Sequence, residues 1–260
     1  MLDRISHDGV TLVEGARGPI RFGFTERTGG VSQAPYASLN LGTHVGDDPT
    51  AVAENRRRVL AALGADGLEE RLLVPNQVHG DEVAVVASAD EEELARVRAL
   101  IAEGTDAIVC TAARVPVMLC YADCVPVVLV CDCGFAVVHS GWKGTYAGIA
   151  GKAARLLADA AGVDASQIDA YIGPHILGDE YEVSEELMEQ FAERFQSIDA
   201  AAGRLLDLSC AIREVLAAAG VSSDRVHDLE LSTMRDNDRF FSYRAEHGTC
   251  GRHAAVAVML

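Results

Sequence analysis

The chain has 260 residues, of which 49% are hydrophobic and 23% charged, and its formal net charge is −17. This composition is typical of a globular protein, and the length is sufficient for a sizeable core. The strong negative charge argues against nucleic-acid and anionic-membrane partners, because both are bound through clustered Lys and Arg side chains.

The cellular compartment is indicated by three features. The first eight residues contain neither a basic segment nor an apolar run, so we expect no signal peptide. The longest apolar stretch, residues 125–130, is too short to span a bilayer. Seven cysteines make an odd number, and five of them fall between Cys110 and Cys133. This favours reduced thiols in a cytoplasmic protein over an extracellular disulfide framework.

The pattern of apolar residues predicts the secondary structure in chain order. Asp48 and Pro49 predict the start of a first helix, as its cap and first-turn residue, and Gly64 predicts its end. Further helices are predicted at 89–102, 145–161, 184–195 and 208–219. Strands are predicted at 20–25, 72–74, 82–86, 107–110, 115–120, 125–131, 135–138, 168–172 and 253–260. Strands and helices mix without regular β-α-β alternation, so we expect an α+β fold.

Three short motifs place potential metal ligands where a strand-like run meets a turn. His79 lies in NQVHG at 76–80, Cys124 in YADCVP at 121–126 and His139 in HSGWKG at 139–144. Two imidazoles and one thiolate suit zinc and leave a fourth coordination position open, as in catalytic zinc sites. Each residue also has a simpler interpretation, namely a turn histidine, a small buried side chain and a strand-end histidine.

A second pair of cysteines competes for the role of metal ligand. Cys131 and Cys133 form a C-x-C pair, which can hold zinc or copper. Alternate residues of a strand lie on the same face of the sheet, so the pair also suits packing against a core. We favour the packing interpretation.

Together, the three motifs resemble the signature blocks of the YfiH-like, laccase-domain family. The resemblance extends through TERTGGVS at 25–32, YASLNLG at 36–42, IGP at 172–174, YEV at 181–183, FFSYR at 240–244 and GR at 251–252. It implies one catalytic domain over residues 1–260, with two mixed sheets between helical layers (α/β/β/α). It also implies a zinc-dependent purine nucleoside phosphorylase acting on adenosine, inosine, guanosine or methylthioadenosine, with adenosine deaminase activity. An older family name, multicopper polyphenol oxidoreductase, implies a polyphenol oxidase instead.

For the implied chemistry, we assign His79, Cys124 and His139 as metal ligands and catalytic residues. Asp123, next to Cys124, is the candidate carboxylate for moving protons during deamination. The expected small-molecule partners are purine nucleosides and phosphate, and the sequence leaves the oligomeric state open.

Four further residues are candidates for substrate binding. Arg27 and Lys143 lie in glycine-rich turns and suit phosphate, Asn40 suits a ribose or base, and Arg56 adds a cation on the first helix. Surface charge, or a turn cap in the case of Asn40, also explains these residues. Other basic residues are interpreted as ordinary or as ion-pair partners of the many acids: His44, His175, His253, Arg244 and Arg252.

Two observations count against multicopper chemistry. Ser232 stands where family members commonly have Cys, and the chain has no His-x-His pair. Two alternatives to the zinc enzyme remain open. One is a cysteine hydrolase with Cys124 as nucleophile and His139 as base. The other is a nucleoside-binding protein without catalytic activity.

Overall fold

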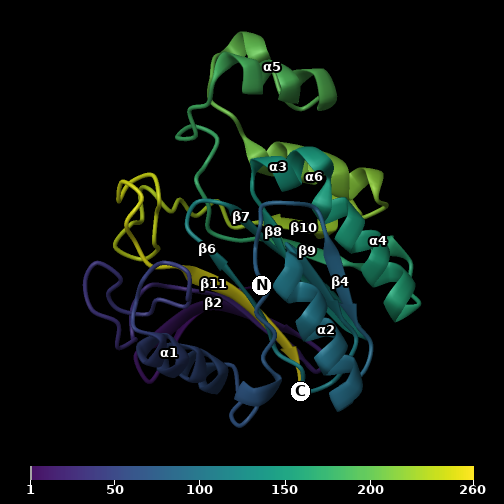
Figure 1. Ribbon diagram of the computed structural model, residues 1–260. Coiled ribbons are helices and arrows are strands. Elements are labelled where there is room, and N and C mark those ends of the chain that lie inside the picture. Colours follow the sequence, from purple (N-terminus) through teal and green to yellow (C-terminus); the bar gives the residue numbers. More distant parts are fainter. Residues whose placement is uncertain (1) are drawn as a thin grey trace.

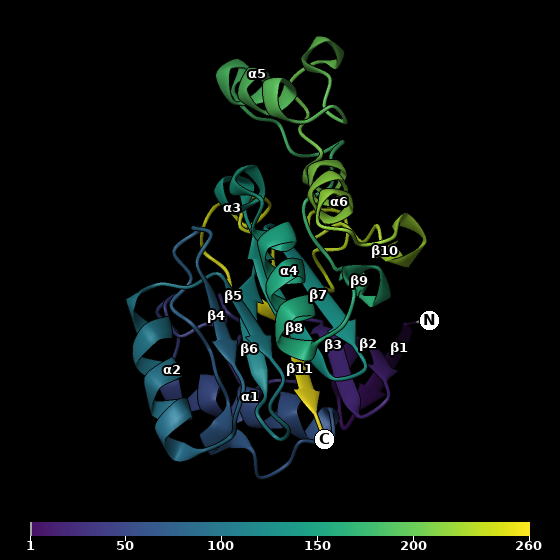
Figure 2. The same ribbon diagram turned by 90° about the vertical axis from the view of Figure 1, so that its right-hand side faces the viewer.

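The computed structural model describes residues 2–260 and consists of two β-sheets packed face to face between helices (Figures 1 and 2). The strands are β1 (Asp3–His7), β2 (Val10–Arg17), β3 (Ile20–Thr25), β4 (Val83–Val86), β5 (Ala107–Cys110), β6 (Val117–Tyr121), β7 (Val125–Cys131), β8 (Gly134–Ser140), β9 (Asp169–Ile172), β10 (Val226–Asp228) and β11 (His253–Met259). The α-helices are α1 (Pro49–Ala62), α2 (Glu91–Glu103), α3 (Trp142–Ala147), α4 (Ile149–Ala161), α5 (Glu185–Arg194) and α6 (Leu208–Ala218).

The five-stranded sheet has the order β1-β2-β3-β11-β6, and its neighbouring strands run antiparallel. The C-terminal strand β11 lies between β3 and β6, so the two ends of the chain are joined in one sheet. Helix α1 covers the outer face, where Val59 and Leu60 pack against Leu12, Met118 and Val256. Asp48 caps this helix by accepting a hydrogen bond from the main-chain N–H of Thr50, as predicted.

The six-stranded sheet has the order β10-β9-β7-β8-β5-β4 and is mixed. The outer pairs β10–β9 and β5–β4 are parallel, whereas the central strands are antiparallel. Helices α4 and α6 cover its outer face, with Leu157 and Ile212 among the buried contacts. Helix α5 lies at the far end of the molecule, beyond α3 and α6 (Figures 1 and 2).

The inner faces of the two sheets form the third core, which includes Phe22, Phe24, Tyr121, Phe135 and Val137. Burial of such large side chains is the main favourable term in folding, at about 1.5–3 kcal/mol each. Helix α2 packs beside β4 and adds Leu94, Val97 and Ile101 to this core. The predicted α+β class and the four-layer order are therefore confirmed.

Two predicted elements differ from the structure. The helix predicted at 145–161 is interrupted, because Gly148 adopts the left-handed conformation (φ +85°) that ends α3 and precedes α4. The strand predicted at 72–74 is reduced to a single bridge between Leu73 and Val117. The strands β1, β2 and β10 were not predicted. Within residues 2–260, no helix has the length and apolar character needed to cross a bilayer.

Candidate active site

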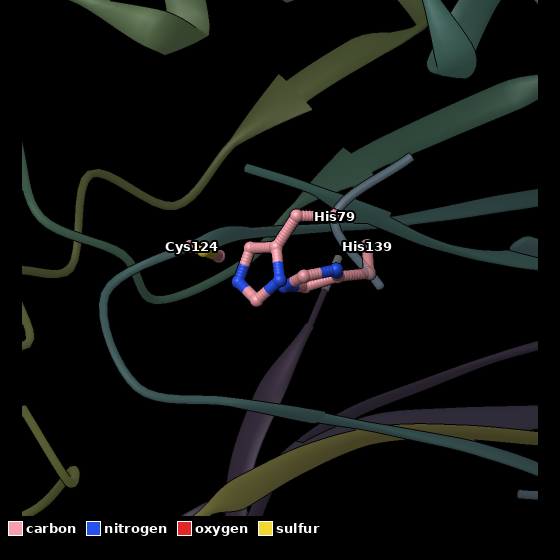
Figure 3. Close-up of side chains that lie close together, drawn as sticks. All are labelled: His79, Cys124 and His139. Carbon is pink, nitrogen blue, oxygen red and sulfur yellow. The ribbon is translucent and has the colours of Figure 1, made fainter. Parts of the chain in front are cut away.

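The three predicted metal ligands converge at one end of the six-stranded sheet (Figure 3). Cys124 lies in the turn between β6 and β7, and His139 lies near the end of β8, where it pairs with Pro126 of β7. His79 comes from the loop that precedes β4. One ligand atom from each residue lies within 4.8 Å of the other two, and no other such group of three is found within residues 2–260. We call this set the His79–Cys124–His139 cluster.

A buried carboxylate, Asp106, holds two parts of the cluster. Its Oδ1 lies 2.7 Å from Nδ1 of His139. The same carboxylate accepts hydrogen bonds from the main-chain N–H groups of Val78, His79 and Gly80 at 3.2, 3.0 and 2.7 Å. His79 has a left-handed backbone conformation (φ +60°), which is unfavourable for a residue with a side chain and is maintained here by these contacts. Asp106 therefore fixes both histidines.

The ionisation of the cluster follows from its mutual contacts. Burial alone would raise the pKa of the Cys124 thiol, but the adjacent His139 and His79 outweigh it and lower this pKa to about 6. Burial opposes protonation of His139, yet Cys124 and Asp106 raise its pKa to about 9. Burial likewise opposes ionisation of Asp106, while its bond to His139 keeps the pKa of this carboxyl below the usual value.

The donor set fits a divalent transition-metal ion. Nδ1 of His139 is engaged by Asp106, so Nε2 is the nitrogen that can act as a ligand, and a carboxylate behind a ligating histidine is the usual arrangement in metal sites. Gly141 contributes space: a Cβ at this position would lie 3.1 Å from both Sγ of Cys124 and Cδ2 of His79. The cluster can therefore hold a metal through two nitrogens and one sulfur.

The cluster opens into a cavity of about 580 Å³, a size that suits a small organic ligand. The walls include the aromatic side chains of Trp142, Tyr181 and Tyr243. Cations lie against two of them. The guanidinium of Arg244 is 5.4 Å from the Tyr181 ring centre, and that of Arg252 is 5.8 Å from the Tyr243 ring centre. The cavity is thus lined by a cluster that could hold a metal ion and by aromatic and basic side chains.

Arg27 and Asn40 are used elsewhere in the fold. The guanidinium of Arg27 binds the carboxylate of Glu246 at 3.1 and 3.2 Å and lies over the ring of Phe241. Asn40 is buried, and its amide bonds to Gly42, Asp47 and the main-chain N–H of Arg252. Neither residue is among the described residues that line the cavity, so the structure does not bring them to the cluster.

Lys143 and Arg56 lie close to the site without entering it. Lys143 is exposed, with its Nζ 5.4 Å from the ring centre of Trp142, whose side chain does line the cavity. Arg56 donates to the carbonyl of Leu41 and lines a neighbouring cavity of about 340 Å³. His44 lines both cavities. Only Asp123 among the non-ligand candidates borders the cluster itself.

The structure also shows the surroundings of the second cysteine pair and of Ser232. β7 ends at Cys131, and Cys133 lies in the two-residue turn before β8, where it is exposed. The two thiols therefore do not share a strand face, because the hairpin reverses the chain between them. Ser232 donates to Glu180 at 2.5 Å and accepts from the N–H of Arg235 at 2.9 Å. Ser232 is buried, links the turn that follows it to Glu180, and is not among the described residues that line the cavity.

Several site residues were missed by sequence reasoning. Asp106 belongs to no recognisable motif, because it is a single acidic residue just before a buried strand. His44, Arg244 and Arg252 line the cavity, although His44 was interpreted as ordinary and the two arginines as ion-pair partners of the many acids. The only signal for His44 and Arg252 was their place in blocks that resemble the family.

Comparison with known proteins identifies the family. The family model described as "Multi-copper polyphenol oxidoreductase laccase" matches residues 21–260. A protein named purine nucleoside phosphorylase YlmD from Geobacillus stearothermophilus is 36% identical over 90% of this chain and 88% of its own length. Purine nucleoside phosphorylase SCO2081 from Streptomyces coelicolor is 38% identical over 90% and 93%.

Solved structures give the same result. The crystal structure of YlmD from G. stearothermophilus has a TM-score of 0.85 at 31% identity and covers 99% of this chain and 98% of its own. The crystal structure of Bacillus licheniformis hypothetical protein YfiH has a TM-score of 0.86 at 28% identity, with the same coverage. The chain belongs to the laccase-domain family, whose matched relatives include proteins named purine nucleoside phosphorylases.

Proposed function

We propose that the chain is a zinc-dependent purine nucleoside phosphorylase, comprising one catalytic domain over residues 1–260, with a slower adenosine deaminase activity. The relatives' names support the phosphorylase reaction. The observation that carries the proposal is the His79–Cys124–His139 cluster, which lines a cavity together with aromatic and basic side chains. Adenosine, inosine, guanosine and methylthioadenosine are the proposed substrates, because aromatic walls suit a purine ring.

Zinc is the proposed metal because two imidazoles and one thiolate suit it and leave one coordination position for a non-protein ligand. When bound, zinc supplies Lewis-acid polarisation of an oxygen or nitrogen of the substrate. The chain's own part is to fix the donors. Asp106 orients the ring of His139 through Nδ1 and holds the loop that carries His79.

Phosphorolysis requires the nucleoside and phosphate to be held in line. An oxygen of hydrogen phosphate forms the new bond to C1′ while the C1′–N9 bond breaks and its electron pair passes to the purine. The phosphate proton ends on the purine nitrogen, so the products are ribose 1-phosphate and the free base. Tyr181 and Tyr243 line the cavity and are the proposed contacts of the base, and the basic residues of the cavity are proposed to attract phosphate.

Deamination requires a carboxylate that moves a proton from water to the departing amine. Asp123 is the only acidic residue among the described residues that line the cavity. Its two oxygens accept hydrogen bonds from Oγ1 of Thr233 at 2.6 Å and from the N–H of Arg244 at 2.7 Å. These bonds orient the carboxylate, and each oxygen retains a second lone pair. We assign the proton-transfer role to Asp123.

A cysteine hydrolase is the second candidate, and one observation favours it. Cys124, His139 and Asp106 form a chain of nucleophile, base and orienting carboxylate, and the pKa of the thiol is lowered to about 6. Alkylation separates the two candidates. If zinc is the cofactor, iodoacetamide should modify Cys124 rapidly only after the metal is removed. A hydrolase would lose activity on alkylation regardless of metal.

Product analysis tests the proposed function. Adenosine incubated with the protein and phosphate should yield adenine and ribose 1-phosphate, with slower formation of inosine or hypoxanthine, all separated by chromatography. His79→Ala should lower both activities strongly, because both use the same metal. Equal adenine release with and without phosphate would identify a hydrolase, and full activity of His79→Ala would exclude the cluster as the catalytic centre.

A further inference from the structure

The wall of the cavity is rich in positive charge, although the chain as a whole is strongly negative. The net charge is −17, yet the described residues of the cavity wall include two arginines, Arg244 and Arg252, against the single carboxylate of Asp123. That carboxylate already accepts hydrogen bonds from the hydroxyl of Thr233 and the main-chain N–H of Arg244. A concave site lined by cations concentrates an anionic ligand. The wall is therefore suited to an anion in a protein that otherwise repels anions.

Arg252 is the cation best prepared to bind that anion. Its Nη1 donates to the carbonyl oxygens of Cys250 and Gly251 at 3.0 and 2.9 Å, which fixes the position of the side chain. Nη1 also lies 3.3 Å from Sγ of Cys250, whereas Nε and Nη2 make no hydrogen bond and no ion pair with a carboxylate within residues 2–260. Arg27, by contrast, is neutralised by Glu246. An oriented guanidinium with free N–H groups can bind a phosphate through two oxygens.

His44 lies next to Arg252 and completes the pair. A Cβ added at Gly42 would lie 2.8 Å from Cγ of Arg252 and 3.4 Å from Cε1 of His44, so the same glycine accommodates both side chains. Neither ring nitrogen of His44 has a hydrogen-bond partner within the described chain. Arg56 lies in the adjoining cavity that shares His44, and it adds positive charge from that side.

Arg244 is placed differently. Its guanidinium contacts the carbonyl of Glu182 at 3.4 and 3.5 Å and lies over the ring of Tyr181, and the residue is exposed. The Arg244–Tyr181 pair therefore suits contact with a flat base, whereas the Arg252–His44 pair offers free donors to a tetrahedral anion.

We propose that Arg252 and His44 form the subsite for the inorganic phosphate that attacks C1′ of the nucleoside. This assignment rests on the proposed phosphorylase function, and it replaces Arg27 and Lys143, which the sequence had favoured. The Arg252–His44 pair and the cluster line the same cavity. The phosphate group of a nucleotide has the same chemistry, so the test must distinguish the two sources.

The test compares Arg252→Gln and His44→Ala with a charge-matched control, Arg155→Gln, in which an exposed arginine of α4 is replaced. In Arg252→Gln, the KM for phosphate should rise about tenfold or more, because a charge-assisted contact is lost. In His44→Ala it should rise by about threefold or more. The KM for adenosine at saturating phosphate and the zinc content should stay near the wild-type values. Arg252→Lys should restore part of the phosphate affinity, and Arg155→Gln should match wild type.

Binding of inorganic phosphate to the resting holoenzyme, followed by calorimetry, provides a readout independent of turnover. Wild-type phosphorolysis with an unchanged phosphate KM in both Arg252→Gln and His44→Ala would overturn the subsite and leave the proposed function intact. Adenine release that does not depend on phosphate would instead overturn the proposed function. In that case, loss of phosphate binding by Arg252→Gln in calorimetry would still support the anion site. If the variants lose affinity for AMP and keep their affinity for inorganic phosphate, the subsite belongs to a nucleotide and the proposal is wrong. His44→Ala keeps the test valid if Arg252→Gln fails to fold.

Discussion

Asp106 and His139 are joined by a 2.7 Å contact between a carboxylate oxygen and Nδ1, at a position where both side chains are almost completely buried. The main-chain N–H of His139 also donates to the carbonyl of Asp106 at 2.7 Å. The imidazole is therefore fixed in orientation and in the choice of its outward-facing nitrogen before any metal binds. Such contacts behind a metal ligand raise the affinity of the site.

Replacement of this carboxylate should weaken the metal site specifically. Asp106→Asn keeps the shape of the side chain but loses the negative charge and leaves fewer acceptors for three N–H groups. We expect zinc affinity to fall about 10–100-fold and the free energy of unfolding to fall by about 1–3 kcal/mol. Competition with a chromogenic chelator and urea denaturation measure the two effects. Asp66→Asn, at an exposed position, is the control, and an equal change there would rule out a specific role for Asp106.

The sequence was sufficient to locate the three side chains of the cluster, because His79, Cys124 and His139 each lie beside a strand in a motif with a turn. It was not sufficient to find Asp106, whose contacts extend over 26 to 33 residues of the chain. Only the folded sheet brings this single acidic residue behind β8. Motifs thus predicted the members of the cluster, whereas the residue that orients them depends on tertiary structure.

Arg27 and Arg252 show the same limit for the anion site. A cation in a glycine-rich turn predicts anion binding, but Arg27 meets Glu246, which lies 219 residues away in the chain. Arg252 also follows glycines, but its lack of an acidic partner depends on which acidic residues lie nearby in the folded chain, and the sequence does not show that. The break at Gly148 was equally unpredictable from the sequence. Glycine also occurs within helices, so its presence alone does not indicate that α3 and α4 are separate.

The purified protein should contain roughly one zinc per chain, bound by the cluster. Cys124→Ser and His139→Ala should each lose most of the metal, as measured by elemental analysis. Cys133→Ser is the matched control, because this thiol is exposed in the β7–β8 turn and should not affect metal content. Full metal retention in both ligand variants, or loss of metal in Cys133→Ser, would place the site elsewhere.

Despite the description of its family, the protein should show no significant laccase activity. A multicopper oxidase needs several copper ions with many histidine ligands, and residues 2–260 contain one three-residue cluster suited to a single ion. Absorption spectra after loading with one equivalent of copper should lack a strong blue band, and phenol oxidation should stay at the background level of free copper. A blue band with robust, copper-dependent turnover would contradict this prediction.

The acid stability of the fold should depend on His253. This residue is fully buried between the rings of Tyr121 and Phe240, and neither ring nitrogen has a hydrogen-bond partner within residues 2–260. Burial, reinforced by Arg252 and Arg27, lowers its pKa to about 3. Between that value and the ordinary pKa of about 6.5, the unfolded chain binds a proton at this position that the folded protein does not. Stability must therefore fall as the pH decreases through this window.

His253→Phe removes the titrating group while keeping a flat ring of similar size. From pH 6.5 to 4.5, metal-free wild-type protein should lose about 2 kcal/mol more unfolding free energy than this variant, since one proton contributes about 1.4 kcal/mol per pH unit. Urea denaturation at several pH values measures the difference, and metal-free protein avoids a contribution from metal release. His247→Asn, at an exposed position with φ +53° that asparagine tolerates, should keep the wild-type slope. If His253→Phe has that same slope, His253 is protonated in the folded protein and its burial does not control acid unfolding.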